Sequence, residues 1–272
     1  MTISFILIFA ALGAFVGFAA GLLGIGGGMI LVPFLNFLLP RIGVPADIAV
    51  HAAIATAMAT IIFTSLSSMR AHHAHGAIRW DVVKLMVPGL LIGGLLSGGA
   101  VFAVVNGLVL AIFFVSFVVY SAIKMFKNSP PPAASHLPKP AAVAGFGGVV
   151  GFVSGLLGAG GGFLSVPYMV RANITMPKAI ATSAALGFFI AVANGIGYIW
   201  SGASYTNLQQ GMLGYIYWPA LIVLVIMSML SAPFGAKQAH RLPVKLLKRI
   251  FATMLLLLAI EMLIETVSVY LA

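Results

Sequence analysis

The sequence predicts an all-α polytopic membrane protein made of two inverted-topology repeats, each a glycine-broken re-entrant segment followed by three transmembrane helices. Three observations lead to this fold class. The chain of 272 residues is 62% hydrophobic and only 7% charged, with a mean hydropathy of +1.16. A glycine-rich motif occurs twice, and the basic residues divide unevenly between the segments that connect the apolar runs. This composition excludes a soluble globular domain.

The glycine-rich motif spans residues 17–35 and returns at residues 151–169, at a constant offset of 134. Eleven of the 19 paired positions are identical. Each interior glycine costs roughly 1 kcal/mol relative to alanine in a helix, so the glycine cluster from Gly24 to Gly28 predicts a helix break. In a bilayer, a broken backbone persists only where protein buries it or where it lines a water-filled cavity. We therefore expect the two breaks to face each other and to form a substrate site.

The apolar runs define the domain organisation. A helix needs about 20 apolar residues to cross the hydrocarbon core. Two runs begin at Ile3 and Ala141, reach the glycine breaks and continue as Met29–Leu39 and Phe163–Val170, which are too short to cross. We expect a first repeat over 1–126, a cytoplasmic proline-rich linker over 127–140 and a second repeat over 141–272. Six unbroken runs are predicted to cross: 48–69, 82–104, 108–126, 179–200, 212–234 and 250–271.

The basic residues choose between two topologies. If each broken segment crossed the membrane, six of the 14 basic residues would lie on one side and eight on the other. If each segment instead turns at its glycines and leaves by the side it entered, 13 lie on one side and Arg41 alone lies on the other. Positive residues concentrate on the cytoplasmic side, so the second model is favoured. It predicts inverted repeats, a signature of secondary transporters, with both termini outside.

Several functional classes are disfavoured by composition. The net charge of +10 resides in short segments between apolar runs, which is an orientation signal and not a nucleic-acid-binding surface. The chain has no cysteine, so it has no disulfide and no thiolate metal site. The first apolar run belongs to the repeat and has no basic residue before it, so we do not expect a cleaved signal peptide. No cofactor motif is present and no enzyme is predicted.

The glycine turns are candidate anion sites. The first N–H groups of a helix lack intrahelical partners and carry partial positive charge, and flanking glycines let an anion approach them closely. Two such ends would bind an anion without a buried lysine. Alternatively, the glycines serve only close helix packing. The predicted substrate-binding residues of the turns are Gly26, Gly27, Gly28, Gly160, Gly161 and Gly162.

Polar residues of the spans that follow the breaks are predicted to complete this site. His51 aligns with Ser183 in the repeat, and both can donate a hydrogen bond to an oxyanion. Thr56, Thr182 and Asn194 are the further candidates. The alternative is that these hydroxyls bond to helix carbonyls and that His51 is a buried packing residue.

Acidic and histidine residues raise the questions of coupling and metal binding. Intramembrane carboxylates suggest proton or cation coupling, so Glu261 is a coupling candidate, with Glu265 a weaker one near the outer end of the last span. The histidines at 72, 73 and 75 lie in a loop between arginines, which repel a metal ion. We interpret this loop as a cytoplasmic anchor and predict no metal site.

The motifs resemble those of the TauE/SafE sulfite exporter family. The resemblance rests on GLLGIGGG and GLLGAGGG, each followed by Val-Pro, and on residues 181–187 and 64–81, and it covers about residues 5–265. It implies a multi-pass permease of the bacterial inner membrane that moves sulfite, sulfonates or related anions. The first half departs from the family pattern, because His51-Ala52-Ala53 stands where a Thr-Ser pair like Thr182-Ser183 is common.

Together these features predict a secondary transporter that exports a small sulfur oxyanion by alternating access. An inside-negative potential of about 100 mV favours the exit of one negative charge by about 2.3 kcal/mol, so export needs no coupled ion. Proton-coupled uptake, a metal-cation permease and an accessory membrane subunit are the alternatives. The expected partners are the anionic substrate and the lipid bilayer, and an oligomer is possible.

Overall fold

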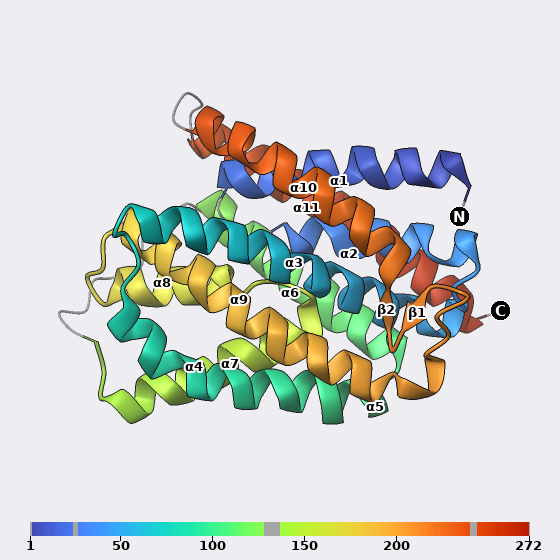
Figure 1. Ribbon diagram of the computed structural model, residues 1–272, viewed down its shortest axis with the longest axis horizontal. Coiled ribbons are helices and arrows are strands. Elements are labelled where there is room, and N and C mark those ends of the chain that lie inside the picture. The colour runs from blue at the N-terminus through green and yellow to red at the C-terminus, as the bar shows by residue number, and fades with distance from the viewer. Residues whose placement is uncertain (1, 24–26, 128–136, 240–243, 272) are drawn as a thin grey trace.

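The computed structural model describes residues 2–23, 27–127, 137–239 and 244–271, and it is almost entirely helical (Figure 1). Mean helix length exceeds that of typical soluble domains because most helices are membrane-spanning in length. The α-helices are α1 (Ile3–Leu23), α2 (Gly28–Leu38), α3 (Ala49–Ala74), α4 (Trp80–Leu95), α5 (Phe102–Val104), α6 (Gly107–Lys127), α7 (Pro140–Leu157), α8 (Gly162–Arg171), α9 (Met176–Ser201), α10 (Trp218–Ala239) and α11 (Val244–Leu271).

Short elements occupy the connections. Three short 3₁₀ segments, η1 (Pro40–Ile42), η2 (Ala46–Ile48) and η4 (Ala203–Tyr205), flank the long helices. A π-helical segment, η3 (Leu96–Val101), joins α4 to α5. Strands β1 (Met212–Leu213) and β2 (Ile216–Tyr217) pair in antiparallel fashion, with Met212 opposite Tyr217.

The long helices run roughly along one axis, so the molecule has two ends (Figure 1). One end, on the right of Figure 1, carries both termini, the α2–α3 and α5–α6 connections and the β-strands; we call it the termini end. The other carries the α3–α4 and α8–α9 connections, the C-terminal ends of α6 and α10 and the N-terminal ends of α7 and α11; we call it the linker end.

Each glycine motif is the bend of a helical hairpin. The α1–α2 hairpin has both outer ends at the termini end, and the α7–α8 hairpin has both at the linker end (Figure 1). The returning arms have 11 and 10 residues, which agrees with the short pieces expected from the sequence. The first arms are longer, with 21 and 18 residues, and both are long enough to cross a membrane. The sequence predicted segments that turn back inside the membrane. Of the two arms of each hairpin, only the returning arm is too short to cross.

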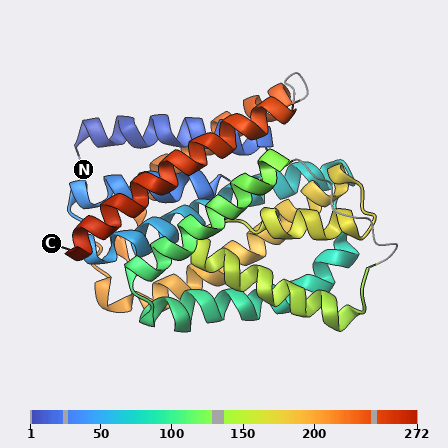
Figure 2. The ribbon, with the colours of Figure 1, turned by 180° about the vertical axis from the view of Figure 1, so that it is seen from behind.

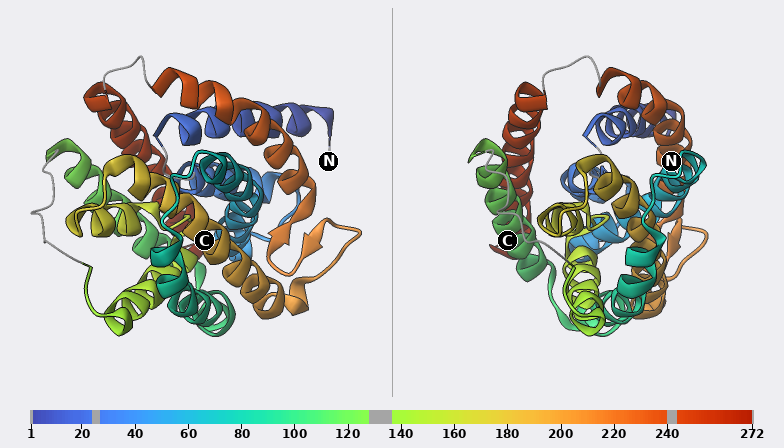
Figure 3. Two further views of the ribbon diagram at one scale, coloured as in Figure 1. Left: turned by 60° about the vertical axis from the view of Figure 1, so that its left-hand side comes forward. Right: turned by 90° about the vertical axis from the view of Figure 1, so that its left-hand side faces the viewer.

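The helices pack in reciprocal pairs between the two halves. Helix α1 packs along α10, and α7 packs along α4, while α3 and α9 contact each other in the interior. Helices α6 and α11 lie side by side on the face shown in Figure 2. The view along the long axis in the right panel of Figure 3 shows the helices close to end-on, surrounding the returning arms. The inverted relation between the complete repeats stays a prediction.

Small residues permit the closest of these helix contacts. Gly17 and Gly151 are equivalent in the repeat, and each lies where its helix crosses a neighbour. A Cβ added to Gly17 would overlap the Ser228 carbonyl on α10, and one added to Gly151 would overlap the Leu90 carbonyl on α4. These glycines are therefore required for backbone approach, as small residues are in membrane helix pairs generally.

One boundary prediction is wrong. The run 212–234 was expected to be a membrane span, but its first six residues form strands and turns, and α10 begins at Trp218. Gly211 and Gly214 have positive φ values of 89° and 58°, which set the turns on either side of β1. The apolar character of the segment has a different cause, because Met212, Tyr215 and Tyr217 are buried against the helices.

The hydrophobicity pattern fits a lipid environment. Six helical segments among the described residues are long and apolar enough to cross a membrane by length and composition. Large apolar side chains such as Ile92, Ile222 and Ile264 are exposed on the outer faces, whereas Phe9, Phe114 and Tyr198 are fully buried. Exposed apolar side chains on helices whose backbone groups bond internally are what a bilayer accommodates. Most of the 127–140 linker lies outside the described residues.

Candidate functional site: the facing glycine turns

Left-handed glycines make both bends possible. Gly27 precedes α2 with φ 64°, and its repeat equivalent Gly161 precedes α8 with φ 74°. Gly158, which ends α7, has φ 63°. Other residues adopt this conformation at an energetic cost, so glycine is the residue of choice at all three positions. The predicted helix break is thus present in both halves; Gly26 lies outside the described residues.

The two bends touch each other in the interior. Gly28, the first residue of α2, lies so close to Gly158 that an added Cβ would overlap the Gly158 carbonyl oxygen. Gly158 in turn lies against Val32 of α2 and the backbone of Ile54 on α3. The structure therefore brings the glycine turns of the two halves together, and it shows that part of the glycine requirement is backbone packing.

The second bend presents backbone donors without acceptors. The N–H groups of Leu164 and Ser165 donate to the Gly161 carbonyl. Among the described residues, the N–H groups of Gly160 through Phe163 make no hydrogen bond. Buried N–H groups are nearly always paired, and here they coincide with the positive end of a helix dipole. This combination is a ready-made site for an anion.

Ser154 adds a side chain that the sequence analysis missed. It lies on α7, is fully buried, and its hydroxyl has no hydrogen-bond partner among the described residues. A Cβ added to Gly161 would lie 3.1 Å from this hydroxyl oxygen, so Ser154 faces the turn. The equivalent position in the first half is Ala20, and comparison of the two repeats therefore does not reveal it.

The helices α3 and α9 line the bend. Gly160 faces Ile61 of α3, with an added Cβ 3.4 Å from the Ile61 Cγ2 atom. Gly187 of α9 approaches the Gly160 carbonyl, with an added Cβ at 3.2 Å from that oxygen. The site is thus formed by the α7–α8 hairpin between the two interior helices.

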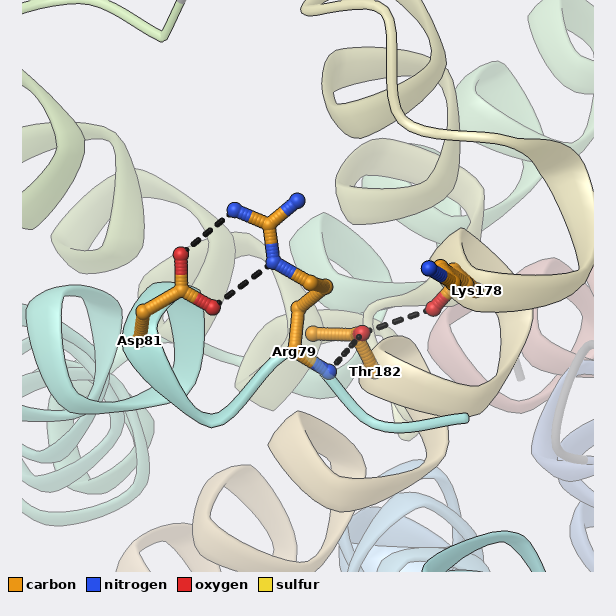
Figure 4. Close-up of polar contacts among 4 residues, drawn as sticks. All are labelled: Arg79, Asp81, Lys178 and Thr182. Carbon is orange, nitrogen blue, oxygen red and sulfur yellow. Dashed lines mark hydrogen bonds and ion pairs between the residues drawn. The ribbon is translucent and has the colours of Figure 1, made fainter. Parts of the chain in front are cut away.

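Thr182 joins two elements at the linker end through hydrogen bonds. Its hydroxyl accepts a hydrogen bond from the Arg79 N–H at 3.0 Å and donates one to the Lys178 carbonyl at 2.6 Å (Figure 4). Arg79 also pairs with Asp81 through two hydrogen bonds of 2.8 and 2.6 Å, which raise the pKa of the Arg79 guanidinium. Thr182 therefore ties the α3–α4 connection of the first half to α9 of the second.

Ser183 and Thr56 each bond to a neighbouring element. The Ser183 hydroxyl lies 2.9 Å from that of Ser165, one turn into α8, and both are buried. The Thr56 hydroxyl accepts a hydrogen bond of 3.0 Å from the Tyr217 N–H of strand β2. Ser183 thus adjoins the returning arm that the glycine turn begins, whereas Thr56 anchors the β-strands.

His51 lies in an aromatic cluster towards the termini end. Its Nε2 atom is 2.9 Å from the Val105 carbonyl, and its ring stacks on Tyr215 with centroids 5.0 Å apart. Phe102 contacts the same ring edge-on at 4.9 Å. Burial raises the pKa of the Tyr215 phenol, so this partner is neutral. No hydrogen bond or ring contact among the described residues joins His51 to the glycine turns.

Asn194 is engaged in helix packing. Its side-chain amide donates to the Ile190 carbonyl at 2.9 Å and to the Gly151 carbonyl at 3.4 Å, and its oxygen accepts from the Ser97 hydroxyl at 2.8 Å. Asn194 is fully buried and joins α9 to α7 and to the π-helical segment η3.

The two glutamates of α11 lie at the termini end. Glu261 is exposed and lines a cavity together with Arg41 and Glu265. Arg41 donates a 2.8 Å hydrogen bond to Glu265 Oε1 and covers the Phe37 ring at 3.4 Å from its centroid. The coupling candidate Glu261 is therefore remote from the glycine turns in the fold.

The histidine loop forms no metal centre in the part of the chain that the structure describes. No group of three or more histidine, cysteine or carboxylate side chains there could hold a metal ion. His73 Nδ1 accepts a 3.2 Å hydrogen bond from the Trp80 indole, and His75 Nδ1 lies 2.8 Å from the Ala71 carbonyl. The predicted loop position is wrong for His72 and His73, which lie in the last turn of α3, and only His75 follows the end of this helix.

A bundle of membrane-length helices around two broken hairpins defines the chain as a multi-pass membrane protein of the transporter class. The family model for the sulfite exporter TauE/SafE matches residues 9–262, and the chain belongs to this family. It is not an enzyme but a membrane transporter.

Curated relatives agree with this class. A probable membrane transporter protein of Haemophilus influenzae is 33% identical over 96% of this chain and 99% of its own length. Probable membrane transporter proteins of Methanocaldococcus jannaschii and Bacillus subtilis (YunE) are 26% and 25% identical, over 93% and 95% of this chain and 93% and 97% of their own lengths. No solved structure matches the chain.

Proposed function

We propose that this protein exports a small sulfur oxyanion, such as sulfite or an organosulfonate, by alternating access around the facing glycine turns. The observation that carries the proposal is the α8 N-terminus, where the N–H groups of Gly160 to Phe163 and the buried Ser154 hydroxyl beside them have no partner among the described residues. Main-chain donors and a hydroxyl suit an oxyanion, since both donate hydrogen bonds without a buried countercharge.

The substrate class follows from family membership together with this donor set. The family model is that of a sulfite exporter, and the donors suit sulfite, sulfonate and sulfate groups alike. Gly27, Gly161 and Gly162 are proposed to let the anion approach the backbone, whereas Gly28 packs against the Gly158 carbonyl. Ser183 is proposed to support the site through Ser165, which lies one turn into α8.

The proposed orientation places the linker end in the cytoplasm of a bacterial inner membrane and both termini outside. Arg79, Lys139 and Arg171 precede or end helices at the linker end, whereas Arg41 lies at the termini end. Positive residues mark the cytoplasmic side. An inside-negative potential of about 100 mV then favours export of one negative charge by about 2.3 kcal/mol.

The Ser154→Ala variant tests the site, because it should preserve or raise the stability of the protein while it lowers the affinity for sulfite. Ser154→Ala removes a buried hydroxyl that has no partner, so it should leave the ligand-free protein equally or more stable, because an unsatisfied buried group costs about 1–3 kcal/mol. The same change should weaken sulfite binding by about tenfold, as expected for the loss of one hydrogen bond to an anion. Ser165→Ala provides a contrast in stability, because its hydroxyl is paired with Ser183 and its loss should destabilise the protein.

Transport is measured as sulfite efflux from proteoliposomes under an imposed inside-negative potential, with and without a pH gradient. Efflux that follows the potential, competes with sulfonates and loses affinity in Ser154→Ala supports the proposal. An unchanged sulfite affinity in Ser154→Ala would show that the α8 N-terminus is not part of the substrate site. If the folded, reconstituted protein transported neither sulfite nor sulfonates, sulfur oxyanions would be excluded as its substrate class.

Proton-coupled uptake is a second candidate, because Glu261 and Glu265 line a cavity at the proposed outer end. In that case the pH gradient, and not the potential alone, would drive sulfite into the vesicles. Glu261→Gln would abolish this dependence while sparing potential-driven efflux.

A further inference from the structure

The termini end contains a cavity of about 60 Å³, and three of the residues that line it each have a buried oxygen without a partner in the part of the chain that the structure describes. Asn36 of α2 and Asp47 of η2 line it from the first half, and Glu265 and Thr266 of α11 line it from the second. Asn36 Oδ1, Glu265 Oε2 and Thr266 Oγ1 are all buried atoms with no hydrogen-bond partner among the described residues. Asn36 and Thr266 are 2% and 4% exposed, so both side chains lie in the interior.

Unsatisfied buried oxygens are uncommon, and three around one cavity require an explanation. Most buried polar atoms have a partner, and each unpaired one costs free energy. All three atoms are oxygens, and the two carbonyl-type oxygens among them can only accept. An occupant that supplies positive charge would satisfy all three at once.

The charge around the cavity is also one-sided. Three of the chain's four acidic residues, Asp47, Glu261 and Glu265, line this cavity or the one beside it. Arg41, which lines the neighbouring cavity, donates a hydrogen bond of 2.8 Å to Glu265 Oε1, and Glu265 Oε2 has no partner among the described residues. Asp47, Glu265 and the Arg41 that pairs with Glu265 carry one net negative charge, and Glu261 in the neighbouring cavity adds a second, so the surroundings favour a cation.

The end of α2 adds to this field. Asn36 belongs to the last turn of α2, and Pro40, directly beyond its end, also lines the cavity. The C-terminal end of a helix carries partial negative charge. This partial charge favours a cation beside the end of α2.

We propose that this cavity is a binding site for an alkali cation, Na⁺ in the first instance, held by the Asn36 amide oxygen, the Glu265 carboxylate and the Thr266 hydroxyl, with Asp47 at its mouth. Oxygen donors suit a hard cation and not a soft metal, and the response to Ca²⁺ described below tests whether that cation is monovalent. The site joins α2 to α11, and it therefore links the first hairpin to the last helix of the second half.

Direct binding to the purified full-length protein in detergent tests the proposal. Binding of ²²Na⁺ is measured without any anionic substrate, with choline chloride keeping the ionic strength constant, and thermal unfolding is followed in parallel. We expect saturable ²²Na⁺ binding and a higher Tm in NaCl than in choline chloride, because a ligand that binds the folded state stabilises it. Since no sulfur anion is present, the outcome is independent of the proposed export function.

Thr266→Val is the discriminating variant. It keeps the shape of the side chain and removes an unpaired hydroxyl, so the protein without Na⁺ should be no less stable, while Na⁺ affinity falls by about tenfold. Ser268→Ala is the matched control, because Ser268 lies on the same helix, is exposed and bonds to the Glu265 carbonyl outside the cavity. It should leave Na⁺ affinity unchanged.

Glu265→Gln provides a second variant that removes charge and nearly preserves volume, and it should abolish ²²Na⁺ binding. Equal stability of the unmodified protein in NaCl and choline chloride, together with no ²²Na⁺ binding, would overturn the proposal and leave water as the occupant. A response to Ca²⁺ alone, or an unchanged Na⁺ affinity in Thr266→Val, would also overturn it.

Discussion

Gly28 of the first half lies directly against the carbonyl oxygen of Gly158 in the second half, at the point where both broken hairpins bend. Neither glycine can carry a side chain there, because a Cβ on Gly28 would overlap that oxygen and Gly158 has a positive φ. The two bends are therefore one structural unit. Under the proposed alternating access, we expect a movement of one hairpin to displace the other.

Gly28→Ala should destabilise the protein by separating the two bends. The added methyl group meets backbone, which cannot move aside as a flexible side chain can, so we expect a loss of about 1–3 kcal/mol, typical of overpacking. Thermal unfolding in detergent, followed by size-exclusion chromatography, measures this loss. Gly145→Ala is the matched control, because an added Cβ on this α7 glycine meets nothing within 4 Å. Equal stability of the two variants would contradict the contact.

Gly160→Ala should separate the packing role of the glycines from their proposed binding role. The new Cβ lies at an ordinary contact distance of 3.4 Å from Ile61, and Gly160 does not have a positive φ, so folding should be nearly unaffected. The methyl group does, however, crowd the unpaired N–H groups of the bend. We expect sulfite affinity in proteoliposomes to fall by about tenfold or more with little change in Tm. A loss of stability equal to that of Gly28→Ala would show that Gly160 acts in packing alone.

The broken hairpins could be predicted from the sequence because their signal is local. Four glycines in five residues cannot continue a helix at acceptable cost, and the second copy of the motif fixed both boundaries to within one residue. The span expected over 212–234 failed for the opposite reason. Hydropathy does not distinguish a membrane helix from a short buried β-hairpin, and the Gly211 and Gly214 turns were read as part of an apolar run.

The roles of the candidate site residues were harder to predict, because their hydrogen-bond partners lie on elements that are distant in the sequence. Thr182 and Asn194 bond to elements that only the tertiary fold brings near them, and sequence alignment of the halves says nothing of such contacts. Ser154 and Thr266 gave no signal, since a serine or threonine in a membrane helix normally bonds to its own backbone. Their significance is visible only once burial and the absence of a partner among the described residues are known.

Thr182→Val should favour opening at the linker end. The change removes the hydrogen bond between the α3–α4 connection and α9, worth about 1 kcal/mol, and should shift the equilibrium towards the open state several-fold. The chain has no cysteine, so maleimide labelling of a single Ile78→Cys probe, buried beside this contact, reports the opening. Thr64→Val is the control, because Thr64 bonds only to carbonyls of its own helix. Equal labelling rates in the Thr182→Val and Thr64→Val variants would show that the Thr182 hydrogen bond does not hold the linker end closed.

Asn194→Ala should damage stability and leave sulfite affinity unchanged in the protein that remains folded. The substitution removes three hydrogen bonds that join α9 to α7 and η3, so we expect a loss of about 1–3 kcal/mol. A double-mutant cycle with Ser97→Ala should show a coupling of at least about 0.5 kcal/mol, because the two side chains are in direct contact. A selective fall in affinity with unchanged stability would instead support the substrate-binding role predicted from the sequence.

Labelling of single cysteines in intact cells should decide the orientation of the molecule. Thr2→Cys and Ser268→Cys lie at the termini end and should react with a membrane-impermeant maleimide added outside, whereas His75→Cys and Pro138→Cys, at the linker end, should react only after the membrane is permeabilised. All four side chains are exposed, so protection reports the membrane and not burial within the protein. The expectation rests on the concentration of basic residues in the linker-end connections. The reverse labelling pattern would place the Arg41–Glu265 pair and the proposed cation site in the cytoplasm, and anion export would then begin from the termini end.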